Sequence, residues 1–236
     1  HTWLRRQRQM CIRDSYDANE LDKLEEVFRT YGETGGGETR HYVHDDVEAE
    51  RYGVDPGNFT GWAPFEEGSD LLFYEGLHGA VVNDEVNLAA LADLKIGVVP
   101  VINLEWIQKI HRDRASRGYT TEAVTDTILR RMHAYVHCIC PQFIETDVNF
   151  QRVPVVDTSD PFCARWIPTA DESLVVIRFK NPRGIDFPYL TSMIHDSWMS
   201  RANSIVIPGG KMDLAMQLIL TPLIERLVTT ARKARS

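Results

Sequence analysis

Two short apolar runs, each about as long as one strand, place the strongest constraint on how this 236-residue chain folds. They are DLLFYE at 70–75 and LKIGVVPVI at 94–102. Runs that stay apolar at successive positions are typical of strands buried on both faces of a sheet. Pro100 interrupts the second run, so we expect it near the end of that strand, where a missing N–H costs least.

Segments with helical periodicity alternate with further segments of strand type. The pattern predicts helices at 19–31 and 104–116, a helix capped by Thr120, and helices at 188–195 and 212–234. Strands are predicted at 39–44, 147–153, 174–179 and 204–207, and residues 45–69, rich in glycine and proline, are predicted to be loop. This alternation favours an α/β fold with a mixed, largely parallel sheet flanked by helices.

Composition narrows the function. The formal charge of −8 argues against nucleic acid as a partner, and no stretch reaches 18 uninterrupted apolar residues, so we expect no membrane partner. Four cysteines without a visible signal peptide indicate a reduced, cytoplasmic protein. Residues 1–15 carry four arginines and no matching periodicity, so we interpret 1–15 as a non-native or disordered tail and 16–236 as the domain.

Charged residues concentrate in the predicted helix at 104–116 and just beyond it. At about 100° per residue, Lys109, Arg112, Asp113 and Arg117 fall within an arc of roughly 140°. Three cations and one carboxylate on one face suit a phosphate-bearing ligand. A solvated, salt-bridged helix face is the alternative interpretation of such a run.

A carboxylate, Glu75, closes the first apolar run and is followed by Gly76. Ligands of α/β proteins bind at the carboxyl ends of the strands, and a carboxylate there commonly holds Mg²⁺ beside nucleotide phosphates. The alternative is a structural acid at a strand end.

Long segments of the chain resemble the bacterial class of phosphoribulokinase. They include YGETGGGETRHYVHDDVEAERYGV (31–54), DLLFYEGLHG (70–79), IGVVPVINLEWIQKIHRDRASRGYTTEAVTDTILRRM (96–132) and SRANSIVIPGGKMDLAMQLILTPLI (200–224). The resemblance implies a P-loop kinase-like α/β fold. It also implies ATP- and Mg²⁺-dependent phosphorylation of ribulose 5-phosphate to ribulose 1,5-bisphosphate, a step of the Calvin cycle.

The resemblance also assigns roles to individual residues. Glu75 matches the metal-coordinating carboxylate, Asp113 a second active-site carboxylate, and Lys109 a lysine that stabilises charge on the transferring phosphoryl group. Arg112 and Arg117 match arginines that hold the sugar phosphate, for which the planar guanidinium is suited.

Regulation is implied as well. Bacterial members of this family are typically oligomers that NADH activates and AMP inhibits, so we expect a homo-oligomer with these effectors. The residues that resemble their effector site are His44, Arg131, Arg178 and Arg201.

The phosphate-binding motif G-x-x-x-x-G-K-[ST] occurs nowhere in the sequence. The glycine-rich stretches at 34–37 and 208–211 are interpreted as turns, because the first lacks a preceding buried strand and the second has Met212 at the hydroxyl position. We therefore expect the chain as given to lack the N-terminal strand and P-loop of the family and to show negligible turnover.

Two alternative functions stay open, and a zinc site is disfavoured. A uridine-kinase relative would share the architecture, and a non-catalytic effector-binding or oligomerisation fragment would bind adenylates without turnover. Zinc at His133, His137, Cys138 and Cys140 is disfavoured, since the cysteines are C-x-C rather than C-x₂-C and Pro141 ends the helix.

Overall fold

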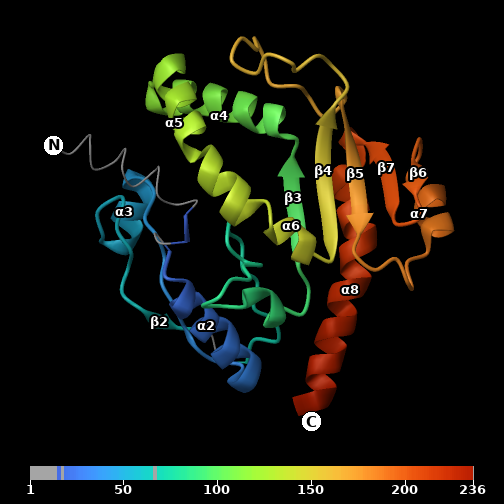
Figure 1. The fold of residues 1–236 in the computed structure, drawn as a ribbon. Coiled ribbons are helices and arrows are strands. Elements are labelled where there is room, and N and C mark those ends of the chain that lie inside the picture. Colours follow the sequence, from blue (N-terminus) through green and yellow to red (C-terminus); the bar gives the residue numbers. More distant parts are fainter. Residues whose placement is uncertain (1–14, 17–18, 66–67, 236) are drawn as a thin grey trace.

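The computed structural model describes residues 15–16, 19–65 and 68–235 (Figure 1). The predicted tail at 1–15 therefore lies almost entirely outside the described residues. A five-stranded sheet forms the centre, in the order β3-β4-β5-β7-β6. Its strands are β3 (Ile96–Pro100), β4 (Val148–Pro154), β5 (Ser173–Phe179), β6 (Trp198–Arg201) and β7 (Ser204–Pro208).

The sheet is mixed, as predicted, but it is not largely parallel. Among the strands of the described residues, only β3 and β4 of this sheet run parallel, while the β4–β5, β5–β7 and β6–β7 pairs are antiparallel. A parallel pair needs a long crossover, and the connection from β3 to β4 supplies one. It consists of α4 (Ile102–Arg117) and α5 (Thr121–Ala134). The expectation of a largely parallel sheet is wrong because strand direction depends on these connections, not on apolar periodicity.

The main core lies between the sheet and α8 (Met212–Arg235), which runs along one face of it (Figure 1). Side chains of β5 alternate between buried and less buried positions, which directs Val175, Ile177 and Phe179 into this core. Helix α8 contributes Ala215 and Ile219. The short α7 (Phe187–Met193) packs beside β6 at the far end.

Helix α8 also meets the length and composition of a membrane span. Over Gly209–Lys233 the mean hydropathy of an 18-residue window reaches 1.2, and 11% of that window is buried. Ala215, Ile219 and Leu220 nevertheless pack against the sheet as a core helix would. The absence of a membrane partner stays a prediction.

Local signals define the ends of the crossover helices. Gly118 has φ 66°, which a residue without a side chain adopts readily, and it ends α4. The Thr120 hydroxyl accepts a hydrogen bond from the Ala123 N–H and begins α5, as predicted. α5 continues into a π-helical turn at Tyr135–Ile139 and the short α6 (Gln142–Glu145).

The N-terminal part of the chain has its own hydrophobic cluster around α2 (Leu21–Thr34). Its buried residues are Leu21, Phe28, Val81, Val86 and Leu88. This part of the chain also contains two two-residue strands, β1 (Glu38–Thr39) and β2 (Ala63–Pro64), and the 3₁₀ turn Leu88–Ala90. The strand predicted at 39–44 is reduced to β1 and an isolated bridge at Tyr42. The predicted loop at 45–69 contains a helix, α3 (Asp46–Tyr52), which the Asp45 side chain caps.

The buried strand predicted at 70–75 does not form. These residues pair with no strand among the described residues, and Phe73 is 77% exposed. The prediction is wrong because an apolar run favours a strand only where a neighbour supplies hydrogen bonds to its backbone.

Candidate active site

Helix α4, which carries the charged side chains, directly follows β3, one of the two strands that pair in parallel (Figure 1). Leu104, Ile107 and Ile110 of the same helix are buried. This burial fixes the rotation of α4 and leaves its charged residues on the remaining faces. The apolar and the charged residues of α4 therefore occupy different faces of the helix.

Asp113 is the centre of this cluster, and only 1% of its side chain is exposed. Lys109 donates from Nζ to Asp113 Oδ2 at 2.7 Å. Arg117 Nη1 and Arg112 Nε donate to Asp113 Oδ1 at 2.9 and 3.2 Å. The structure thus brings together four of the predicted site residues, three cations around one buried carboxylate.

The two arginines extend from this centre toward solvent. Arg112 and Arg117 keep 61% and 43% of their side chains exposed, whereas Lys109 keeps 13%. Each arginine uses one N–H on Asp113 in these pairs, and the guanidinium carries five in a planar fork. The cluster therefore presents a positively charged surface suited to an incoming phosphate group.

Burial and charge act on both partners of the central pair. Burial opposes ionisation of Asp113, but the hydrogen bonds and charges of Lys109, Arg112 and Arg117 outweigh it, so the pKa of Asp113 lies below its ordinary value. Burial lowers the pKa of Lys109, and the charges of Arg131 and Arg112 add to this, while Asp113 acts in the opposite direction. Asp113 is consequently ionised at neutral pH, and Lys109 loses its proton at a lower pH than a lysine in water does.

These shifts predict an acid-sensitive contribution to stability. A carboxyl whose pKa is depressed by folding stabilises the fold above its unfolded value of about 3.9, and this contribution is lost as the pH falls through the folded value. We expect the unfolding free energy of the wild-type chain to exceed that of Asp113→Asn above about pH 5, with the gap narrowing below about pH 4. Urea unfolding at several pH values measures this, and a gap independent of pH would contradict it.

Glu75, the other predicted carboxylate, lies in a segment without regular secondary structure and is exposed. Among the described residues, no ion pair or hydrogen bond in the structure joins it to the α4 cluster. An exposed carboxylate fits the oxygen preference of Mg²⁺. Both Asp113 oxygens instead accept from cations, which leaves less acceptor capacity for a metal. The metal roles of Glu75 and Asp113 remain predictions.

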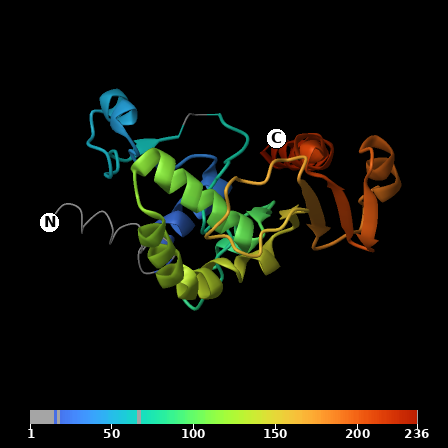
Figure 2. The same ribbon diagram turned by 90° about the horizontal axis from the view of Figure 1, so that it is seen from above.

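The four predicted effector residues are not gathered in one place. Strand β7 lies between β5 and β6. In the register of the sheet, Arg178 on β5 and Arg201 on β6 each lie opposite Ser204 on β7. Arg131 lies on α5, close enough for its charge to act on Lys109. His44 lies just before α3, and α3 and β6 lie at opposite ends of the molecule (Figure 1 and Figure 2).

Glu48, which the sequence analysis did not single out, lies against His44. Its carboxylate accepts from the His44 N–H at 2.7 Å and contacts His44 Nδ1 at 3.0 Å. These contacts, the first above all, hold the pKa of Glu48 at about 2. The signal was the spacing of His41, His44 and Glu48, which was missed because the two histidines were predicted to lie in a strand and Glu48 in a loop.

The mixed sheet, the helix that follows its parallel strand, and the three cations on that helix define an α/β protein that handles phosphate groups. Comparison with known proteins makes this specific. The model of the "Phosphoribulokinase / Uridine kinase family" matches residues 3–159. The chain belongs to that family, and within it to the bacterial phosphoribulokinases.

Individual relatives agree with this assignment. Phosphoribulokinase 2 of Cereibacter sphaeroides is 81% identical over 222 residues, which cover 94% of this chain and 76% of the relative. The phosphoribulokinase of Xanthobacter flavus is 71% identical over 220 residues, covering 93% and 76%. The solved phosphoribulokinase from Rhodobacter spheroides superposes with a TM-score of 0.85 at 78% identity, covering 93% and 76%. This likeness confirms the predicted P-loop kinase-like α/β fold.

Proposed function

We propose that the chain takes part in ATP-dependent phosphorylation of ribulose 5-phosphate to ribulose 1,5-bisphosphate, the phosphoribulokinase step of the Calvin cycle. The observation that carries this proposal is the convergence of Lys109, Arg112 and Arg117 on buried Asp113. The names of relatives that are 64–81% identical supply the substrate.

The reaction is an in-line transfer in which the C1 hydroxyl oxygen bonds to the γ-phosphorus while the bond to the ADP oxygen breaks and the hydroxyl proton passes to a general base other than Asp113. Protein catalysis here consists mostly of positioning and charge stabilisation. Lys109 would neutralise charge that develops on the transferring phosphoryl group. Arg112 and Arg117 would hold the C5 phosphate through their solvent-exposed guanidinium groups.

Asp113 is best assigned a positioning role in this scheme. Its oxygens already accept from Lys109, Arg112 and Arg117, and its depressed pKa makes it a poor proton acceptor. It orients the three cations toward one side of α4. Glu75 is the carboxylate we assign to hold Mg²⁺, which would supply further neutralisation of phosphate charge when bound with ATP.

A substrate panel tests the proposal. In a chain that also carries the family's phosphate-binding loop, ADP formation should depend on ribulose 5-phosphate and not on uridine. Turnover of uridine instead would favour a uridine-kinase function. The 236-residue chain by itself should show negligible turnover, and robust turnover would overturn that expectation.

Replacing Arg117 by alanine is expected to raise the apparent KM for ribulose 5-phosphate about 10- to 100-fold, the loss expected for one charge-assisted hydrogen bond. The KM for ATP should change little. Arg114→Ala is the matched control, because Arg114 lies on the same helix outside the Asp113 network. Steady-state kinetics in the loop-bearing chain measure both constants, and equal increases in the two KM values would count against a sugar-phosphate role.

Effector binding by NADH and AMP, and assembly into a homo-oligomer, belong to the same proposal. His44 lies just before α3, and Arg201 is the last residue of β6. These two elements lie at opposite ends of the molecule, so one small effector cannot contact both residues within one chain (Figure 2). A site that uses all four predicted residues therefore needs more than one copy of the chain. We place the enzyme in the cytoplasm, where the free cysteines Cys138, Cys140 and Cys163 stay reduced.

A further inference from the structure

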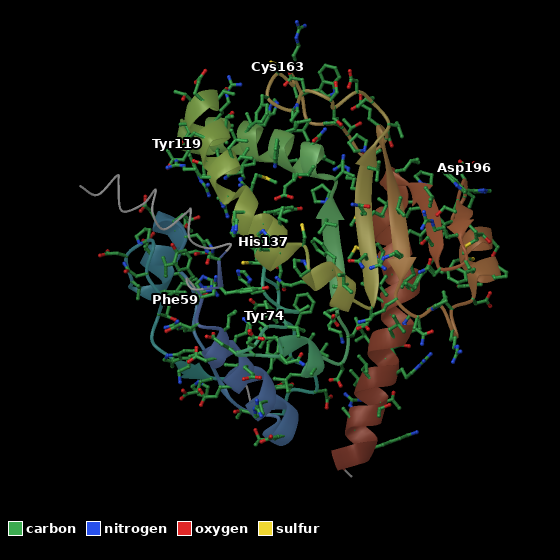
Figure 3. The ribbon with its side chains drawn as sticks, in the orientation of Figure 1. Phe59, Tyr74, Tyr119, His137, Cys163 and Asp196 are labelled. Atoms are coloured by element: carbon green, nitrogen blue, oxygen red, sulfur yellow. The ribbon has the colours of Figure 1, made fainter. Side chains whose placement is uncertain are left out.

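A second cluster of chemically active side chains lies where the chain enters α3, and none of its members belongs to α4. His41, His44 and Glu48 each direct one ligand atom into a small volume, and these three atoms lie within 4.8 Å of one another. Phe59, labelled in Figure 3, marks this region, because Tyr42 is bridged to it. The phosphoryl-transfer proposal uses neither His41 nor Glu48.

The distances within the cluster resemble those of a metal site. Glu48 Oε2 lies 3.0 Å from His44 Nδ1 and 3.2 Å from His41 Nε2. In a tetrahedral zinc site with bonds of about 2.0–2.1 Å, neighbouring ligand atoms lie about 3.3 Å apart. Two of the three separations lie near this value, and the third, between the two imidazole nitrogens, is no more than 4.8 Å.

The backbone holds the two histidines in place. The His41 N–H donates to Thr60 Oγ1 at 2.9 Å, and the His41 carbonyl accepts from the Thr60 N–H at 2.8 Å. Between the histidines, Val43 is fully buried, and its N–H donates to the Asn58 carbonyl at 2.9 Å. The capping side chain of Asp45 fixes the start of α3 and with it Glu48. The three ligands are thus positioned without an ion.

One atom of the cluster is left without a satisfactory partner. His41 Nε2 is buried and makes no hydrogen bond of acceptable geometry within the described part of the chain, although Glu48 lies beside it. A buried polar atom in this state costs free energy. Helix capping explains why Glu48 contacts the His44 N–H, but it does not explain the placement of His41.

We propose that His41, His44 and Glu48 bind a divalent transition metal of the Zn²⁺ class. Two imidazoles and one carboxylate suit zinc, whereas Mg²⁺ prefers oxygen ligands alone. His44 is exposed and the other two ligands are half-buried, so the ion has access and a fourth coordination position faces solvent. The inference does not depend on the effector role proposed for His44, since its test measures metal binding.

Calorimetric titration of Zn²⁺ into the metal-free 236-residue chain tests the site. We expect one Zn²⁺ per chain, and His41→Ala or His44→Ala should each weaken binding by at least about tenfold. With Co²⁺ as the probe, the visible absorption of a tetrahedral ion should appear in the wild-type chain and disappear in both variants. Glu48→Gln keeps an acceptor for the His44 N–H but removes the charged ligand, so it should weaken binding while the circular dichroism spectrum stays unchanged.

His133→Ala is the matched control. His133 and His137 also form a close pair, with ring centroids 4.3 Å apart, on α5 and the turn after it, where Figure 3 labels His137. Its loss should leave Zn²⁺ affinity unchanged. The proposal is overturned if the wild-type chain shows no saturable Zn²⁺ binding. It is equally overturned if His133→Ala abolishes binding while His41→Ala does not.

Discussion

Replacing Asp113 by alanine is expected to lower the unfolding free energy by about 3–5 kcal/mol, the loss typical when one partner of a buried ion pair is removed. Lys109, 13% exposed, would be left as a buried cation with Arg112 and Arg117 close by. Since whole domains are stable by only about 5–15 kcal/mol, this is a large fraction. Urea unfolding followed by circular dichroism measures the change.

Asp126→Ala provides the matched control for this experiment. Asp126 pairs with Arg130 at 2.7 Å with the same i, i+4 spacing, but both side chains are exposed. Its loss should change the unfolding free energy by no more than about 0.5 kcal/mol. Asp113→Asn keeps the shape of the side chain and gives a measurable variant where the alanine variant does not fold. Equal effects at positions 113 and 126 would show that the Asp113 network is an ordinary surface charge cluster.

A second large effect is expected on catalysis. Lys109→Met, in a chain that carries the family's phosphate-binding loop, should lower kcat about 10²- to 10³-fold, the loss seen when one group that stabilises transition-state charge is removed. The KM values should change far less. Asp113 keeps Arg112 and Arg117 as partners, so we expect this variant to be more stable than Asp113→Ala.

Lys95→Met is the control for Lys109→Met. Lys95 is similarly shielded, with 15% of its side chain exposed, and pairs with Asp147 at 3.2 Å near the start of the sheet. Its replacement should leave kcat within about threefold of the wild-type value. Steady-state kinetics under saturating substrates compare the two variants. A loss at Lys109 that appears only in KM would place this residue in binding rather than in the chemical step.

The charged network of α4 was predictable in part. Lys109, Asp113 and Arg117 are four residues apart, and that spacing alone puts them on adjacent turns of one helix face. The spacing could not show that Asp113 is buried, because burial depends on what packs against the helix from elsewhere. The pKa shifts and the positioning role follow from burial, so they required the structure.

The sequence by itself determined the features that depend on near neighbours: the α/β class, the helix boundary between Gly118 and Thr120, and the apolar side of α4. The tertiary structure decided the direction of the strands, the absence of a strand at 70–75, and the meeting of His41, His44 and Glu48. The reason is physical. Helical hydrogen bonds and caps join residues within one turn, whereas ladders and burial are completed by segments far along the chain, which local periodicity does not specify.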